Sequence, residues 1–148
     1  MAIFFLNACD SSRIYEENRE HEDRVWDKND ISKFIFVIPE TGPTYNVYFN
    51  LRNTMNYPHN NIYISYQLKD SLGRTLQNEL KNFLLFDPKL GTPYGKSGLG
   101  DIFDHQFALL EKFSFESAGT KTMEIQQFMR YDSLPEIVSI GVRVELAK

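Results

Sequence analysis

The sequence predicts an all-β fold, a two-sheet antiparallel β-sandwich of the jelly-roll or immunoglobulin-like kind. From residue 31 onward, apolar and polar residues alternate with a period of two, which is typical of strands with one buried face. Clusters of Pro, Gly, Asn and Asp separate these runs, and no series of helical patterns lies between them. Aromatic residues make up 14% of the chain, which also favours strands. Many short strands joined by turns fold into sandwiches.

The first half of the chain contains three clear strands. Residues 34–38 alternate and then end at a turn rich in Pro and Gly, and residues 45–51 place Tyr, Val, Phe and Leu on one face. Residues 62–68 resume the alternation after a turn at Pro58, which cannot donate to a β-ladder and restrains the residue before it. We expect one face of each strand in the core.

The segment 77–86 is ambiguous, because its apolar residues would also fit one face of a helix. We favour a strand, since its neighbours are β and Asp87-Pro88 ends it. Further strands are expected from residue 102, over 120–129 and over 138–146, where the alternation is amphipathic. The residues expected in the core of this sandwich are Phe36, Val47, Phe49, Ile64, Ile125, Ile140 and Val142.

Composition excludes several classes of protein. The net charge of −4 and the absence of a basic block argue against a nucleic acid or an anionic membrane surface as the partner. No stretch of about 18 apolar residues follows Cys9. None of the three histidines has a Ser, Cys or carboxylate at the spacing of a nucleophile and its base, and no ligand spacing indicates a metal. We therefore expect no catalytic residues, no cofactor and no enzyme activity.

The N-terminus carries a lipidation signal. In the run Leu6-Asn7-Ala8-Cys9, an apolar residue stands three before the only cysteine and a small residue directly before it, as at the cleavage sites of bacterial lipoproteins. The apolar stretch ahead of it is short and lacks Lys or Arg, so the alternative is an unmodified cysteine beside a first strand. We predict a residual signal peptide over 1–8, acylation of Cys9, a charged, solvated spacer over 9–25 and a single sandwich domain over 26–148.

A long connection between residues 87 and 101 is the expected working surface. It holds four glycines and two prolines, and no Lys-Ser or Lys-Thr follows at the spacing of a phosphate loop. Loops of this length in compact domains are usually functional or mobile. Because Leu90, Tyr94 and Leu99 give it apolar anchors, we expect it to dock onto another protein.

The ordered set of residues resembles GldH, the gliding-motility lipoprotein family of the Bacteroidetes. The residues that carry this resemblance span most of the chain: Cys9, Trp26, Phe34, Tyr45 to Leu51, Arg52-Asn53, Tyr57-Pro58, Asn60-Asn61, Phe113, Gly119, Gln127, Met129-Arg130, Leu134, Ile137 and Ile140-Gly141. The resemblance implies an envelope lipoprotein that is required for surface gliding, is associated with the type IX secretion apparatus, and works by contacts with other envelope proteins and not by catalysis. Among these residues, Arg52, Tyr57, Asn60 and Arg130 are candidates for partner binding, and each also has a purely structural reading.

Two other functions and the location of the protein stay open at this stage. If exposed, Tyr45, Tyr48, Tyr57, Tyr63 and Tyr66 could stack on sugars, which would make the chain a cell-surface carbohydrate-binding module. A pocket with two suitably spaced carboxylates would indicate a hydrolase. The residues after Cys9 lack an acidic run, so we expect the periplasmic face of the outer membrane, with attachment through the lipid alone.

Overall fold

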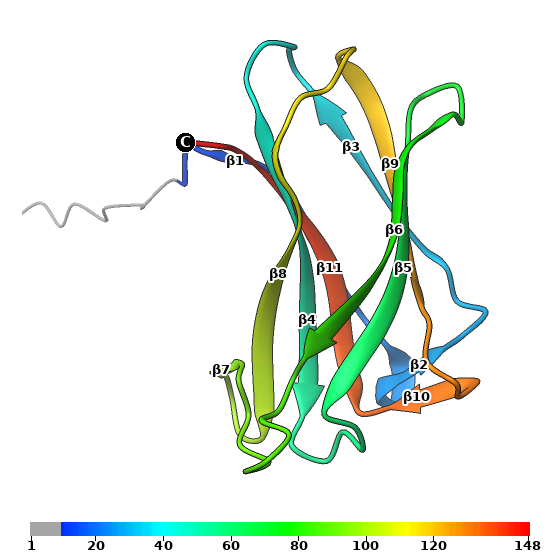
Figure 1. Cartoon of the computed structure of the whole chain (residues 1–148), viewed down its shortest axis with the longest axis vertical. Coiled ribbons are helices and arrows are strands. Elements are labelled where there is room, and N and C mark those ends of the chain that lie inside the picture. The colour runs from blue at the N-terminus through cyan, green and yellow to red at the C-terminus, as the bar shows by residue number, and fades with distance from the viewer. Residues whose placement is uncertain (1–9) are drawn as a thin grey trace, which may run out of the picture.

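The computed structural model describes residues 10–148 and contains strands, one short 3-10 turn and no α-helix within that range. Accordingly, no helix in this part of the chain is long and apolar enough to cross a membrane. The elements, labelled as in Figure 1, are β1 (Arg13–Glu20), η1 (Glu22–Arg24), β2 (Val25–Asp27), β3 (Ser32–Ile38), β4 (Tyr45–Thr54), β5 (Asn61–Lys69), β6 (Thr75–Leu84), β7 (Lys96–Ser97), β8 (Ile102–Phe113), β9 (Gly119–Gln127), β10 (Ser133–Pro135) and β11 (Ile137–Leu146).

Two antiparallel sheets form the predicted sandwich. The five-stranded sheet has the order β1-β11-β4-β8-β7 and the four-stranded sheet the order β3-β9-β5-β6, while β2 and β10 pair as a separate ribbon. Eight of these strands are long: β1, β3, β4, β5, β6, β8, β9 and β11. If they are renumbered 1 to 8 in chain order, the order is 1-8-3-6 in one sheet and 2-7-4-5 in the other. In this arrangement β5 and β6 are the only consecutive long strands that pair. That is a jelly roll, since an immunoglobulin domain pairs its first two strands in one sheet.

The core lies between the two sheets and is built from every second residue of the long strands. Strand β3 alternates buried and exposed residues along its whole length, and β5 does nearly the same. The seven core residues predicted from the sequence are confirmed, each no more than 2% exposed: Phe36, Val47, Phe49, Ile64, Ile125, Ile140 and Val142. Trp26 joins them from the β2–β10 ribbon, where it is fully buried and stacks on His21.

The expected solvated spacer over 9–25 is wrong for residues 13–20, which form β1 and pair with β11 from Arg13 opposite Glu145 to Glu20 opposite Ser139. Arg13, Glu16 and Glu20 of β1 are exposed, whereas Tyr15 packs against Phe36 and the guanidinium of Arg19 lies over the ring of Phe34. The sandwich therefore begins well before residue 26. Periodicity missed β1 because Glu17 and Arg19 follow Tyr15 on its inward face, so the strand shows no alternation of apolar and polar residues.

The strand predicted over 77–86 is confirmed as β6, and the helical alternative is excluded. Its apolar residues seemed to fit a helix because Leu76, Leu80 and Leu84 share the outer, exposed face of an edge strand. Phe83 turns inward, and its ring stacks on that of Phe107 with centroids 4.2 Å apart.

Candidate functional site

Three connections meet at one end of the sandwich, and we call them the loop end: residues 55–60, 85–101 and 128–136. They lie together because β4, β6 and β9 end there while β5, β8 and β11 begin there. Figure 1 shows them at the bottom of the view, together with β7 and the β2–β10 ribbon. The first residue of β1 lies at the opposite end, since Arg13 pairs with Glu145 near the C-terminus.

The structure places six of the seven predicted partner-binding residues on the surface of this end. Leu90 is 77% exposed, Tyr94 54% and Leu99 89%, all in the connection from β6 to β8. The other three are also exposed: Asn60 before β5, Arg130 after β9 and Arg52 near the end of β4. Other large apolar side chains are exposed in the same connections, namely Met55, Phe128 and Tyr131.

The structure buries Tyr57, which the sequence analysis had selected as a candidate surface residue for partner binding. Its ring is 5% exposed and stacks on Phe86, and its hydroxyl donates a hydrogen bond of 2.8 Å to the carbonyl oxygen of Asn61. Burial raises the pKa of this hydroxyl. The tyrosine holds the 55–60 connection against the core, and it offers nothing to a partner.

The long connection after β6 is folded around Asp87. The carboxylate accepts hydrogen bonds from the backbone N–H groups of Lys89 (2.8 Å) and Leu90 (3.0 Å), and these two bonds lower its pKa. The N–H of Gly91 also donates to the Asp87 carbonyl oxygen, in a turn where Gly91 has a φ of +70°. Leu90 is therefore held outward on an ordered turn.

Gly95 brings the same connection against β8. A Cβ at this position would lie 2.7 Å from Nε2 of His105 and 2.9 Å from the carbonyl oxygen of Asp104, so only glycine allows the close approach. His105 is 9% exposed, and its Nε2 lies 2.8 Å from Oδ1 of the buried Asn53. Burial lowers the pKa of this imidazole from its ordinary 6.5 to about 4, so the ring is neutral at pH 7.

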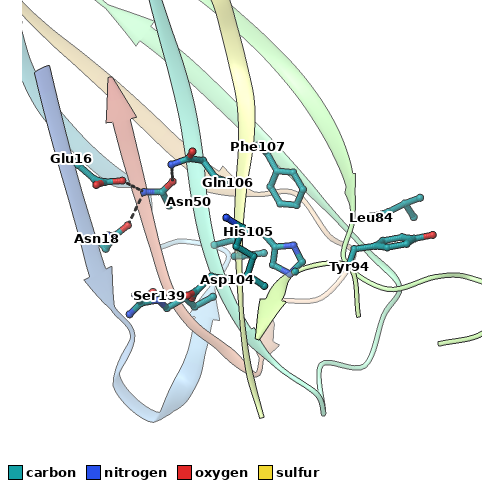
Figure 2. Close-up of a pocket in the computed structure, with 14 residues that line it drawn as sticks. Glu16, Asn18, Asn50, Leu84, Tyr94, Asp104, His105, Gln106, Phe107 and Ser139 are labelled. Carbon is teal, nitrogen blue, oxygen red and sulfur yellow. Dashed lines mark hydrogen bonds and ion pairs between the residues drawn. The ribbon is translucent and has the colours of Figure 1, made fainter. Parts of the chain in front are cut away.

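A hollow of about 660 Å³ opens beside the loop end, between the outer face of β1, β4 and β8 and residues 94–96. Figure 2 shows its two walls, with Glu16, Asn18 and Asn50 on one side and Leu84 and Tyr94 on the other. The charged side chains that line it balance: two are acidic (Glu16, Asp104) and two are basic (Arg52, Lys96). Arg52 and Asp104 pair at 2.7 Å across the strands.

Carboxamide side chains form a bonded network along this hollow, drawn with dashed lines in Figure 2. Nδ2 of Asn50 donates to Oε2 of Glu16 (3.0 Å) and to Oδ1 of Asn18 (3.1 Å). Nε2 of Gln106 donates to Oδ1 of Asn50 (3.1 Å). These bonds fix the orientation of three amides that the hollow presents to solvent.

The tyrosine platform proposed for sugar binding does not exist. Tyr45 and Tyr66 are fully buried and Tyr57 nearly so, which leaves Tyr48 half-buried on one sheet and Tyr63 exposed on the other. Tyr45 and Tyr66 stand in register with the inward apolar residues of β4 and β5. Two rings on different sheets cannot form one stacking surface.

Within residues 10–148, no group of three or more His, Cys, Asp or Glu side chains is placed to hold a metal ion. The carboxylates that line the hollow are engaged, Asp104 with Arg52 and Glu16 with Asn50. The predicted lipidation site, Cys9, lies outside the described residues.

Of the polar residues that line the hollow, sequence reasoning selected only Arg52, as a candidate for partner binding. Asn50 was recognised as a residue on the polar face of the strand predicted over 45–51, with no role assigned to it. Asn18 could not be placed because β1 was not predicted, and Gln106 lies in a strand with weak alternation. His105 was recognised as a histidine in an uncertain segment, with no signal for its burial.

Comparisons with known proteins find the model of the family described as GldH lipoprotein, which matches residues 13–144. The chain is 26% identical over 154 residues to the gliding motility lipoprotein GldH homolog of Christiangramia forsetii, covering 97% of this chain and 90% of that one. It is also 26% identical over 152 residues to the gliding motility lipoprotein GldH of Flavobacterium johnsoniae, covering 98% and 92%. Among solved structures, dimeric latent PorU from Porphyromonas gingivalis matches 92% of this chain and 13% of its own, at 10% identity and a TM-score of 0.40.

Proposed function

Because the chain belongs to the GldH lipoprotein family, we propose that it is a non-catalytic docking component of the gliding-motility machinery and of the type IX secretion system, anchored in the outer membrane by lipid on Cys9. The family and the two relatives named above support the assignment to gliding motility and to lipoproteins. We propose in addition that this chain docks onto other proteins, that it serves the type IX secretion system, and that it sits on the periplasmic face of the outer membrane.

The exposed apolar side chains of the loop end carry the proposal. Leu90 and Leu99 are the two most exposed large apolar residues of those described. Solvent-exposed apolar groups gathered over several connections mark a protein-interaction surface more often than a solvated one. Because Asp87 and Gly91 hold the turn in one conformation, a partner would meet an ordered surface and lose little entropy on binding.

The position of β1 supports the same conclusion. Arg13 lies four positions after Cys9, so an acyl anchor at Cys9 keeps the start of β1 within about 14 Å of the membrane surface. The loop end lies at the other end of the ten-residue strand β4, about 33 Å away. An anchored chain would therefore present its loop end away from the membrane, towards other proteins.

Substituting the two leucines tests the proposal. We expect the double variant Leu90→Ser, Leu99→Ser to abolish gliding in a gliding bacterium that lacks its own family member, and to reduce the release of type IX secretion substrates. Surface substitutions of this kind change the free energy of unfolding by less than about 0.5 kcal/mol. Thermal stability and the level in membranes should therefore be those of the parent protein.

The matched control is Leu72→Ser. Leu72 is 76% exposed in the turn between β5 and β6, at the end of the sandwich opposite the loop end. Normal gliding in the control with gliding lost in the double variant supports docking through the loop end. Normal gliding in both, or equal loss in both, contradicts it.

A further inference from the structure

The amides of the hollow form one row across four strands. Asn18, Gly141, Asn50 and Gln106 are successive cross-strand partners on β1, β11, β4 and β8. Three inter-strand spacings make this row roughly 14 Å long. Gly141 has no side chain, and Asn18 lies over it in the space that a Cβ would fill, which brings its amide to Asn50. The row is thus a shallow polar track with a flat floor.

The track has a free donor at one end and a free acceptor at the other. The network uses Oδ1 of Asn18 and Nε2 of Gln106, and among residues 10–148 no hydrogen bond engages Nδ2 of Asn18 or Oε1 of Gln106. Both side chains are exposed. Because the internal bonds already orient these groups, the side chains lose little conformational entropy when a ligand binds to them. A ligand that carries two amides along its length can accept from Asn18 with one and donate to Gln106 with the other.

Charge and shape narrow the class of ligand. The two acidic and two basic side chains of the hollow cancel, and Arg52 is already paired, so neither a polyanion nor a polycation is favoured. The volume of about 660 Å³ lies in the range of small-ligand sites. Tyr94, 54% exposed, offers an aromatic face on the wall opposite the amides. Polar groups on one side and a ring on the other suit a sugar, which has a hydroxylated rim and an apolar face.

We propose that this hollow binds a neutral, linear glycan whose sugar rings carry acetamido groups, lying across β1, β11, β4 and β8. The spacing of about 4.8 Å between strands is close to the length of one pyranose ring, so successive rings would face successive strands. An acetamido group on one ring accepts from Asn18 and that on another ring donates to Gln106, while Tyr94 stacks on a ring at the far wall. This site uses none of the residues of the rejected tyrosine platform.

The experiment is a titration of the ¹⁵N-labelled full chain carrying Cys9→Ser, followed by the NMR signals of side-chain amides. The probe is tetra-N-acetylchitotetraose, and the comparison is cellotetraose, which has the same backbone with hydroxyls in place of acetamido groups. We expect saturable shifts of the Asn18, Asn50 and Gln106 amides with the first sugar and much weaker ones with the second. Gln106→Ala, an exposed change, should weaken binding roughly tenfold, the equivalent of one hydrogen bond.

Asn78→Ala, an exposed amide on the outer face of β6, is the control and should bind as the parent does. The inference fails if the acetylated sugar causes no saturable shift, if cellotetraose binds equally well, or if Gln106→Ala binds as tightly as the control. It is separate from docking at the loop end: Leu90 and Leu99 do not line the hollow, so their double variant should retain glycan binding.

Discussion

Lowering the pH from 7 to 5 should destabilise this protein through His105. Burial beside Asn53 and Phe107 lowers the pKa of His105 to about 4, against an ordinary value of 6.5. Between these two values the unfolded chain binds a proton that the folded chain does not. The free energy of unfolding therefore falls as the pH falls from about 6.5 to about 4, and the cost of His105 fades away above that window.

The two pKa values set the size of the effect. At 1.36 kcal/mol per pKa unit, His105 lowers the free energy of unfolding by about 0.2 kcal/mol at pH 7 and by about 2 kcal/mol at pH 5. A loss of that size is a large share of the 5–15 kcal/mol typical of a folded domain. The nearby carboxylate of Asp104 favours the protonated imidazole and so opposes the effect of burial, and the pKa of about 4 is the net result of the two.

Urea unfolding at pH 7, 6 and 5 measures this effect, with the fluorescence of Trp26 as the signal, since Trp26 is the only tryptophan and is fully buried. The comparison is His105→Gln, which keeps an amide near Asn53 and does not titrate. Both proteins carry Cys9→Ser. His21, whose pKa burial also lowers, and the carboxylates titrate in both, so only the difference between the two slopes reports His105. Parallel loss of stability in the two proteins would refute the reasoning.

Two further predictions concern β1 and the anchor. Gly141→Ala should cost about 1–3 kcal/mol of stability and expose β1 to proteolysis, because the added Cβ would overlap Oδ1 of Asn18 and the carbonyl oxygen of Glu17. If the variant unfolds at the parent's urea midpoint and β1 stays protected from proteolysis, the strand can shift at no cost and the prediction is wrong. Cys9→Ser should move the protein from the membrane to the soluble periplasmic fraction, since an acyl anchor is the attachment we propose; recovery of the variant in the membrane fraction, with its signal peptide removed, would argue for another attachment.

The long strands could be predicted because each has one buried face. The alternation in 34–38, 45–51 and 62–68 identified β3, β4 and β5, and every predicted core residue is buried. The same pattern also predicts that Tyr45 and Tyr66 point inward, because they share a strand face with Val47 and Ile64. The interpretation of these two tyrosines as exposed rings ignored that pattern. Strand β1 gave no such pattern, because its stability comes from pairing with β11 and not from a buried stripe.

The loop end and the hollow also differ in how much of each the sequence alone could predict. Leu90 and Leu99 could be found from the sequence, because an apolar residue in a loop rich in Gly and Pro is conspicuous. The amide row could not, since Asn18, Asn50 and Gln106 are distant in the chain and only the jelly-roll strand order makes them neighbours. The burial of His105 likewise depends on Gly95, whose contact joins the 85–101 connection to β8 and follows from no local sequence pattern.

The pairing of β1 with β11 also determines how the protein would carry mechanical load. Strand β1 runs from the end of the sandwich opposite the loop end towards the loop end. If the chain is anchored through Cys9 as proposed, a membrane pulling on Cys9 and a partner pulling on the loop end would draw β1 along its own axis past β11. Ladder hydrogen bonds lie perpendicular to the strands, and a sliding force loads all of them at once, whereas a peeling force breaks them one by one. Arg143, which pairs with Asp10 ahead of β1, and Arg19, whose guanidinium lies 4.4 Å from the ring centroid of Phe34, add resistance near the two ends of the strand. A lipid-tethered part of a motility machine that is held in shear can bear force without unfolding from its anchor.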